Sequence, residues 1–153
     1  MIHIVTGKIN SGKTTTMLRL YQSLGGDGFV SLKTMKQGRP HRFDALRLKT
    51  GERRVLIKRR DDLNTENIAF SVGPYVFIKE TVDWIKSTLK ILPVDTSGPI
   101  FFDEVGLLEI AQDGFYDDVT WLMSQNITLY LSVRTSCLNQ ILKTFHVTTY
   151  ELK

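Results

Sequence analysis

The chain has 153 residues, of which 42% are hydrophobic and 24% are charged, values that fit one compact globular domain over residues 1–153. Its single cysteine, Cys137, excludes an internal disulfide and a structural zinc site built from cysteines. No apolar run reaches the roughly 18 residues of a membrane span, and the N-terminus lacks the order of a signal peptide. We therefore expect a cytoplasmic protein that does not enter the membrane.

The N-terminal part of the chain changes from a strand pattern to a helix pattern and back. Residues 2–6 (IHIVT) are a short apolar run typical of a buried strand, and residues 11–24 carry apolar side chains at helical spacing. That helix should end at GGDG, residues 25–28, because glycine favours turns. Residues 29–36 (FVSLKTMK) alternate between apolar and polar side chains, which predicts a second strand.

Four strand patterns fill the middle of the chain, at 43–50, 53–59, 68–70 and 75–78. The first two are connected through TGE, a glycine-containing sequence typical of a hairpin. The stretch 75–91 also fits a helix, because its apolar residues recur on one helical face. PVDTSG, residues 93–98, should end that helix.

The last third of the chain again alternates between strands and helices. Strand patterns occur at 99–102, 127–133 and 146–152, and helix patterns at 114–124 and 136–143. Strands that alternate with helices form parallel sheets covered on both faces. We therefore predict an α/β fold with a mainly parallel sheet flanked by helices, extended by an antiparallel hairpin near residues 29–59.

Residues 7–14 (GKINSGKT) lie between the first strand and the first helix and match the P-loop pattern of Gly, four residues and Gly-Lys-Ser/Thr. Gly7 permits a tight turn and Gly12 permits backbone angles closed to other residues, so that successive N–H groups can face an anion. Lys13 places a cation against the β- and γ-phosphates, and Thr14 offers its hydroxyl to Mg²⁺. We expect the nucleotide to contact Gly7, Lys8, Ile9, Asn10, Ser11, Gly12, Lys13, Thr14 and Thr15.

The apolar strand 99–102 runs into two carboxylates. Asp103 follows the strand at the edge where open α/β sheets bind ligands, and we expect it to hold Mg²⁺ with Thr14. Alternation along the strand points Glu104 to the other side of the strand end, where a carboxylate can orient a water molecule and accept its proton. The sequence thus predicts a metal carboxylate beside a catalytic one, with an ordinary acidic surface pair as the alternative.

Arg134, Ser132 and Glu109 are further candidates for this site. Arg134 ends the strand 127–133, and it faces the γ-phosphate if that strand lies between the P-loop strand and the Asp103 strand. It would then stabilise charge on the transferred phosphoryl group, as an arginine finger does; otherwise it is a surface arginine. Ser132 is a milder candidate for sensing the phosphate. Glu109 follows close to the same edge, where it pairs with a cation, shapes the site or is solvated.

Together these segments resemble the THEP1-type P-loop nucleoside-triphosphatases. That family combines an N-terminal P-loop, a GF strand entering a basic hairpin, and a DE-[IV]-G-x-[ML]-E segment. The matching residues here are GKINSGKT at 7–14, GFVSLKTMKQGRPHRFD at 28–44, GPY at 73–75 and DEVGLLE at 103–109. The resemblance spans most of the chain, and DEVGLLE is its most specific part.

The resemblance implies a RecA-like domain that hydrolyses ATP, GTP and other nucleoside triphosphates to diphosphate and phosphate with Mg²⁺. It implies Glu104 as the catalytic carboxylate, Asp103 as the metal carboxylate, and Lys13 and Thr14 as phosphate and metal contacts. The P-loop here lacks the Pro-Gly run common in the family, and Leu107-Leu108 replaces a frequent Lys-Met. These departures leave the expectation of nucleotide binding unchanged. They bear on the rate of hydrolysis and on which nucleotide this chain prefers.

Two other functions fit parts of the sequence. SGKTTTMLRL, residues 11–20, also resembles the loop of thymidine-kinase-type enzymes, so a kinase acting on a nucleoside or another small molecule is one alternative. The single cysteine excludes the zinc lasso of those enzymes, and VGLL follows DE where they have Gln and aromatic residues. The segment 33–60 holds eleven Lys and Arg residues against two acids, which favours weak nucleic-acid binding by a nucleotide-gated switch. A solvated hairpin face would explain the same charges.

Overall fold

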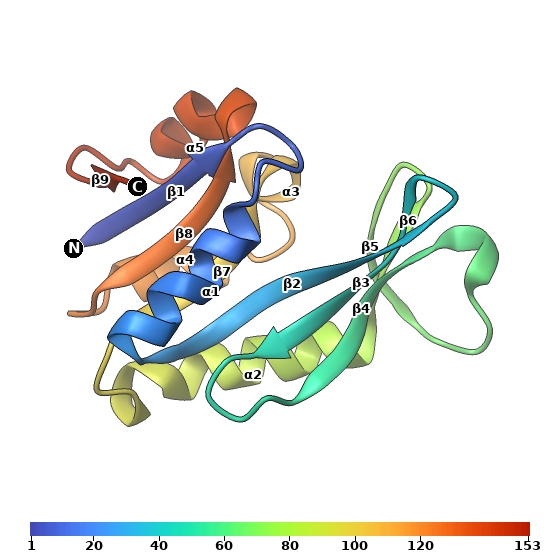
Figure 1. The fold of residues 1–153 in the computed structure, drawn as a ribbon, viewed down its shortest axis with the longest axis horizontal. Helices are drawn as coiled ribbons and strands as arrows, with labels where there is room; N and C mark the ends of the chain where they lie inside the picture. Colours follow the sequence, from blue (N-terminus) through green and yellow to red (C-terminus); the bar gives the residue numbers. More distant parts are fainter.

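One nine-stranded sheet forms the centre of the molecule, and five α-helices pack against it (Figure 1). The computed structural model describes residues 1–153. The strands are β1 (Ile2–Gly7), β2 (Asp27–Lys36), β3 (Arg39–Arg47), β4 (Arg53–Arg59), β5 (Ile68–Val72), β6 (Tyr75–Ile78), β7 (Ile100–Val105), β8 (Leu129–Arg134) and β9 (Glu151–Leu152). The helices are α1 (Lys13–Leu24), α2 (Lys79–Asp95), α3 (Leu107–Ile110), α4 (Tyr116–Met123) and α5 (Leu138–Thr144).

The sheet consists of two halves that differ in strand direction. Its strand order is β5-β6-β4-β3-β2-β7-β8-β1-β9. Strands β2, β7, β8, β1 and β9 pair in parallel, and we call them the parallel half. Strands β3, β4, β6 and β5 continue from β2 in antiparallel pairs and form the antiparallel half. The antiparallel extension is therefore larger than the one hairpin near 29–59, because β5 and β6 add a second hairpin beyond β4.

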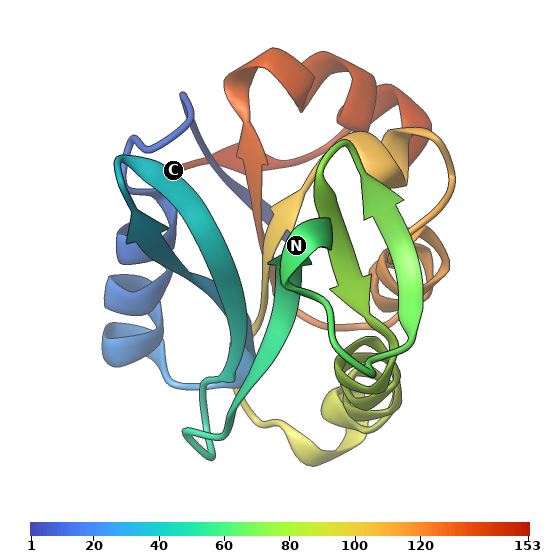
Figure 2. The same cartoon turned by 90° about the vertical axis from the view of Figure 1, so that its right-hand side faces the viewer.

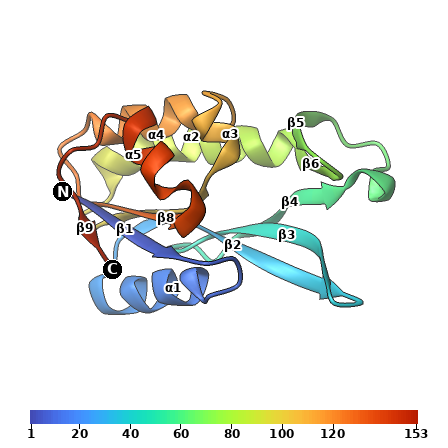
Figure 3. The same ribbon diagram turned by 90° about the horizontal axis from the view of Figure 1, so that it is seen from above.

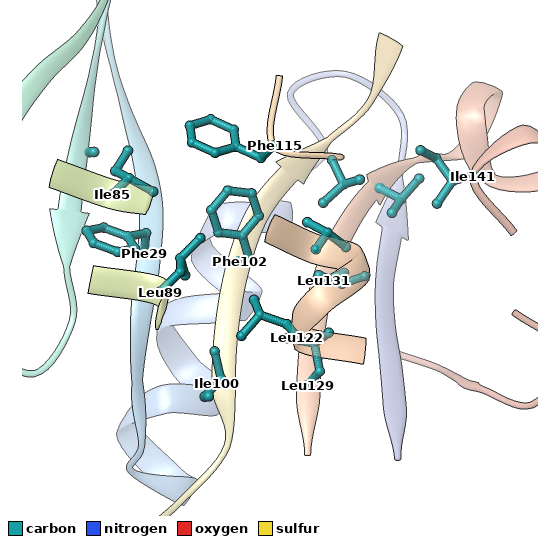
Figure 4. Close-up of a cluster of buried hydrophobic side chains, with 14 of the residues drawn as sticks. Phe29, Ile85, Leu89, Ile100, Phe102, Phe115, Leu122, Leu129, Leu131 and Ile141 are labelled. Carbon is teal, nitrogen blue, oxygen red and sulfur yellow. The ribbon is translucent and has the colours of Figure 1, made fainter. Parts of the chain in front are cut away.

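Helices cover both faces of the sheet. Figure 3 shows α1 on one face and α2, α3, α4 and α5 on the other. The larger core lies between the sheet and this second group, where Leu89, Phe102 and Leu122 are buried (Figure 4). A smaller core, which includes Val5 and Met17, lies under α1. Burial from both faces explains why β7 and β8 are almost continuous apolar runs. None of the helices has both the length and the apolar character that crossing a bilayer requires.

Residues 75–91 contain both structures that their sequence allows. Strand β6 occupies the first four residues, and α2 begins directly after it. The helix continues through Pro93, which was expected to end it. Pro93 lies in the last turn, where its missing N–H removes only a terminal bond, and the Thr96 N–H still bonds the Leu92 carbonyl oxygen at 2.9 Å.

The C-terminal strand is shorter than the pattern at 146–152 predicted. Strand β9 contains only the last two of these residues and pairs with His3 and Ile4 of β1. The Val147 N–H instead bonds the Leu142 carbonyl oxygen at 2.8 Å. This stretch therefore completes the turn after α5 before the chain reaches the sheet edge, and only the tip of the alternating segment joins β1.

Candidate active site

The loop between β1 and α1 forms a cradle at the carboxyl edge of the sheet. Gly12 directly precedes α1 with a φ of 91°, a left-handed angle that favours glycine. A side chain at Gly7 would collide with the hydroxyl of Ser11, and the Ser11 N–H closes the turn by bonding the Lys8 carbonyl oxygen at 3.1 Å. Because the first N–H groups of a helix have no partner within it, the loop and the start of α1 can together bind an anion.

The side chain of Lys13 folds back over this loop. Its Nζ donates to the carbonyl oxygens of Lys8 at 2.9 Å and Gly7 at 3.4 Å. Burial lowers the pKa of the Lys13 ammonium group below its usual value, and the charge of Glu104 opposes this shift. Residues 8–12 of the loop are exposed. The lysine is thus held by neutral oxygens alone, and its charge is available to a bound phosphate.

Asp103, near the end of β7, connects three elements of the structure. Its Oδ2 accepts hydrogen bonds from Thr14 Oγ1 of α1 at 2.7 Å and from the Ser31 N–H of β2 at 3.0 Å. Its Oδ1 accepts a short hydrogen bond from the Ser132 hydroxyl of β8. These contacts fix the carboxylate beside the P-loop, so the structure brings together the two residues that the sequence predicted as metal ligands.

The pair of Thr14 and Asp103 fits the ligands that Mg²⁺ takes in proteins. Hydroxyl and carboxylate oxygens are hard donors, and Mg²⁺ in nucleotide enzymes is held by one or two protein oxygens together with phosphates and water. The buried Ser31 hydroxyl oxygen has no hydrogen-bond partner, so an oxygen beside Asp103 remains able to bond to a bound group.

A bulge in β7 sets the direction of Glu104. The pairing of β7 with β8 is regular as far as Phe102 and resumes at Val105. Between them Glu104 has a φ of 62°, an angle uncommon for residues other than glycine, and its N–H bonds the Ser132 hydroxyl at 2.7 Å. The bulge therefore interrupts the regular alternation that was expected to point Glu104 away from Asp103. Asp103 and Glu104 instead line the same cavity.

The carboxyl group of Glu104 lies in a strongly charged environment. Its pKa is raised to about 7, first because the surrounding protein removes water from it and second because Asp103 is negatively charged. The cations Lys13, Arg134 and Lys33 act in the opposite direction. The residue as a whole is nevertheless exposed to solvent, so the crowding acts on its carboxyl group from one side only. No side-chain hydrogen bond or ion pair occupies its carboxylate oxygens, whereas those of Asp103 accept three hydrogen bonds.

Two cations flank the carboxylates. Arg134 ends β8, which lies between β1 and β7 as its predicted role required, and it stands in register with Gly7. It is exposed and lines the same cavity as Glu104. Lys33 approaches from β2, on the other side of β7, and its Nζ donates to the side chain of Asn10 in the P-loop. The sequence gave no sign of this contact, because only the pairing of β2 with β7 brings Lys33 to the loop.

One cavity of about 660 Å³ joins all of these groups. Its polar end is lined by residues 9–15 of the P-loop and α1, and its apolar end by side chains of the antiparallel half together with others from β2, β7, α2 and the segment before α4. The antiparallel half curls, so that β5 and β6 (green) lie beside the segment around α3 (orange) in Figure 2. Asp103, Glu104 and Arg134 line the cavity between these parts, and its volume is typical of small-molecule sites.

A P-loop, a carboxylate pair near the end of β7 and an intervening strand β8 thus form one site. A family model described as NTPase matches residues 2–153 of the chain. The chain belongs to this NTPase family. The THEP1-type resemblance drawn from DEVGLLE and the P-loop is therefore confirmed, and the match includes both halves of the sheet.

Two solved structures share the fold of this NTPase. THEP1 from the hyperthermophile Aquifex aeolicus matches with a TM-score of 0.70 and 19% identity, over 99% of this chain and 88% of that one. A human cancer-related nucleoside triphosphatase matches with a TM-score of 0.66 and 20% identity, over 97% of this chain and 85% of that one. No curated protein matches the chain by sequence. The predicted RecA-like P-loop fold is confirmed.

In this NTPase, Glu109 is part of the framework of the site. It is only 4% exposed, and its two carboxylate oxygens accept hydrogen bonds from the N–H groups of Gly106 at 2.8 Å and Phe115 at 3.0 Å. Burial raises the pKa of the Glu109 carboxyl group, and these two hydrogen bonds oppose the rise. The residue is thus neither solvated nor paired with a cation. Helix α3, which it caps, was not predicted because four residues are too few to show a helical period.

About half of the eleven cations in the basic segment 33–60 form ion pairs within the protein. Five of its cations form ion pairs with acids: Arg42 and Arg53 with Asp44, Arg47 with Asp27, Arg54 with Glu52, and Lys58 with Glu66. Such pairing reduces the positive potential that would attract a phosphate backbone. Weak nucleic-acid binding by this segment stays a prediction, which a salt titration with a random oligonucleotide would test.

Proposed function

We propose that this NTPase hydrolyses ATP, GTP and other nucleoside triphosphates to diphosphate and phosphate, and that Glu104 activates the attacking water. The observation that supports this most directly is the difference between its two carboxylates. Asp103 is held by three hydrogen bonds beside Thr14, whereas the carboxylate of Glu104 is unpaired in the same cavity. One carboxylate is thus fixed in place, and the other is free to bind a water molecule.

The P-loop gives the triphosphate its position. Its N–H groups and the start of α1 would hold the β- and γ-phosphates, and Lys13 would exchange its carbonyl partners for phosphate oxygens. These contacts reach only phosphates, which every nucleoside triphosphate shares. We therefore expect hydrolysis of several nucleotides, with base preference determined elsewhere.

Thr14 and Asp103 would hold Mg²⁺ together with the phosphates, as their oxygen donors and their 2.7 Å contact support. The ion supplies Lewis-acid neutralisation of the phosphate charge when it is bound. The Ser31 N–H and the Ser132 hydroxyl keep the carboxylate of Asp103 in place for this role.

Glu104 carries the proton in the reaction. The water oxygen bonds to the γ-phosphorus, the bond from that phosphorus to the bridging oxygen breaks, and the diphosphate leaves with the electron pair. The carboxylate of Glu104 accepts the proton that the water loses. Lys13 and Arg134 stabilise the negative charge that develops on the oxygens of the transferred group.

The substitution Glu104→Gln tests this proposal, because it keeps the shape of the side chain and removes the proton acceptor. We expect the variant to bind ATP with Mg²⁺ but to release phosphate at least about 100-fold more slowly, since a positioned general base contributes roughly 10²–10⁴-fold. Phosphate release from ATP, GTP, CTP and UTP and calorimetric binding measure the two effects. Glu80→Gln, an exposed acid in the first turn of α2, is the matched control.

A Glu104→Gln variant that hydrolyses at the wild-type rate contradicts the proposal. So does a wild-type protein whose phosphate release is negligible until a hydroxyl acceptor is added, because that behaviour defines a kinase. Nucleotide that remains a triphosphate when bound to the variant supports the proposed role of Glu104.

A further inference from the structure

The cavity extends well beyond the groups that a triphosphate needs. Its apolar end is lined by six aromatic residues, which we call the aromatic pocket: Phe29, Phe43, Tyr75, Phe77, Phe102 and Phe115. They come from β2, β3, β6, β7 and the segment before α4, and Ile85 of α2 also lines this end. Phe29, Phe102 and Phe115 belong to the buried core and form the base of this end, whereas Phe43, Tyr75 and Phe77 are only partly buried. A cavity with an aromatic lining beside polar groups is typical of a site for a small organic ligand.

Contacts among the rings keep the pocket open. Phe115 packs edge-to-face on Phe102 with ring centroids 5.2 Å apart, and Phe70 packs on both Phe115 at 6.1 Å and Phe77 at 5.8 Å. These rings join the edge hairpin of the antiparallel half to the end of β7. On the same strand as Phe77, Tyr75 packs on Phe43 at 6.2 Å, and the Tyr75 hydroxyl bonds the Pro40 carbonyl oxygen at 3.2 Å. These contacts fix the rings that line the apolar end of the cavity.

The position of the pocket relative to the phosphates follows from the proposed function. Glu104 acts on the γ-phosphate from the side opposite the leaving diphosphate, because attacking and leaving oxygens lie in line. The nucleoside is attached at the other end of the phosphate chain. Glu104 lines the same cavity two residues after Phe102 of β7, so we expect the aromatic pocket to open where the attacking oxygen arrives. Its occupant is therefore a second molecule and not the nucleoside of the triphosphate.

We infer that the aromatic pocket binds a small organic alcohol with an aromatic body, whose hydroxyl group replaces water as the acceptor of the γ-phosphoryl group. Aromatic walls favour an aromatic ring through stacked and edge-to-face contacts. The hydroxyl would lie at the polar part of the cavity, beside Glu104, Lys33 and Arg134, which line it together with Lys13 and Asp103. This inference rests on the proposed assignment of Glu104 as proton acceptor.

The transfer balances without any further reactant. The hydroxyl oxygen bonds to the γ-phosphorus, and the bond from that phosphorus to the bridging oxygen breaks. The diphosphate leaves with the electron pair, and the hydroxyl proton passes to Glu104. The products are an aromatic phosphate monoester and a nucleoside diphosphate, so water and the alcohol compete for the same phosphoryl group.

Phosphorus NMR of the full chain with ATP and Mg²⁺ tests the inference, because it separates phosphate from phosphate monoester. The probes are benzyl alcohol, 2-phenylethanol and tyrosol, each in millimolar excess, with glycerol as the non-aromatic acceptor. We expect at least one aromatic alcohol to form its monoester at least about tenfold faster than glycerol does, because binding raises the effective concentration of its hydroxyl. Ester formation no faster than with glycerol for all three alcohols overturns the inference.

Two variants locate the transfer. Val72→Phe places a ring into the cavity from β5, and Val94→Phe makes the same change on α2 at a residue that is 87% exposed and outside the cavity. The ratio of monoester to phosphate should fall at least about tenfold in Val72→Phe and stay at the wild-type value in Val94→Phe. Ala45→Val, a smaller change in the cavity wall, replaces Val72→Phe if that variant does not fold. An equal ratio in the cavity and control variants overturns the inference.

The same samples separate this inference from the proposed function. Phosphate release without any alcohol measures hydrolysis alone. Hydrolysis with no preference for aromatic alcohols contradicts the inferred acceptor site but not the proposed hydrolysis of nucleoside triphosphates. The absence of both phosphate and monoester contradicts the proposed hydrolysis as well.

Discussion

The two halves of the sheet contribute to the site in different ways. The parallel half supplies polar groups at its carboxyl edge: the P-loop after β1, Asp103 and Glu104 near the end of β7, and Arg134 at the end of β8. The antiparallel half supplies mainly apolar and aromatic walls, and its own charges are largely joined in ion pairs. Lys33, which reaches Asn10 from β2, stands at the boundary between them.

This difference follows from strand direction. Parallel strands end at one edge, so the residues that follow them meet there whatever their separation in sequence. Antiparallel strands end alternately at both edges and present side chains from their faces, which suits them to form a wall. We therefore expect substitutions in the parallel half to change the rate of hydrolysis and substitutions in the antiparallel half to change stability or the choice of second ligand.

The largest expected effect is that of Lys13→Ala in the parallel half. Without the ammonium group, the N–H groups of the loop cannot neutralise the γ-phosphate, and phosphate release should fall about 1,000-fold or more. Initial rates at saturating nucleotide and Mg²⁺ measure it, with Lys143→Ala on the exposed face of α5 as the control. Undiminished turnover would contradict the P-loop assignment.

Arg47→Leu should lower the stability of the fold and leave the rate of hydrolysis unchanged. Arg47 pairs with the buried Asp27 of β2 at 2.9 Å. Removing the cation leaves a buried carboxylate without its counter-charge, which destabilises a protein by about 3 kcal/mol. Urea unfolding followed by tryptophan fluorescence measures the loss, while the rate per folded molecule stays constant. Arg39→Leu, an exposed arginine of β3 without an ion pair, is the control. Equal stability of the two variants would contradict a structural role for the pair.

Arg134→Ala tests whether the exposed end of β8 belongs to the catalytic edge. We expect the maximal rate to fall on the order of 100-fold and the KM to change much less, because the arginine acts on charge that develops in the transition state. Arg134→Lys should recover part of the rate, since it keeps the charge and loses the planar fork. A raised KM with an unchanged maximal rate would move Arg134 from catalysis to binding of the ground state.

The smallest expected effect concerns pH and the buried Glu109. Its pKa is raised in the folded protein above the ordinary value of 4.5, so folding favours its protonated form. The stability that this adds is complete below pH 4.5 and is lost as the pH rises through the folded pKa. The free energy of unfolding of the wild type, relative to Glu109→Gln, should therefore decrease as the pH rises above 4.5. A difference that increases with pH would show that the hydrogen bonds from Gly106 and Phe115 outweigh burial.

Local sequence was enough to predict most elements and the segments that the structure brings together around the cavity. The P-loop is recognisable because a single short segment contains its turn, its cation and its hydroxyl, between a strand and a helix. Asp103 and Glu104 are recognisable because they follow an apolar run long enough to be a buried strand. The role predicted for Arg134 required β8 to lie between β1 and β7, and the structure has this strand order.

Only the tertiary structure decided which distant side chains complete the site. Sequence separations of 72 residues between Ser31 and Asp103, and of 23 between Lys33 and Asn10, leave no periodic trace in the chain. The bulge at Glu104, the burial of Glu109 and the curl that creates the aromatic pocket likewise depend on neighbouring strands. Backbone conformation and turn chemistry act over a few residues, so sequence determines them directly. Packing joins surfaces from the whole chain, so its contacts exist only once the sheet has formed.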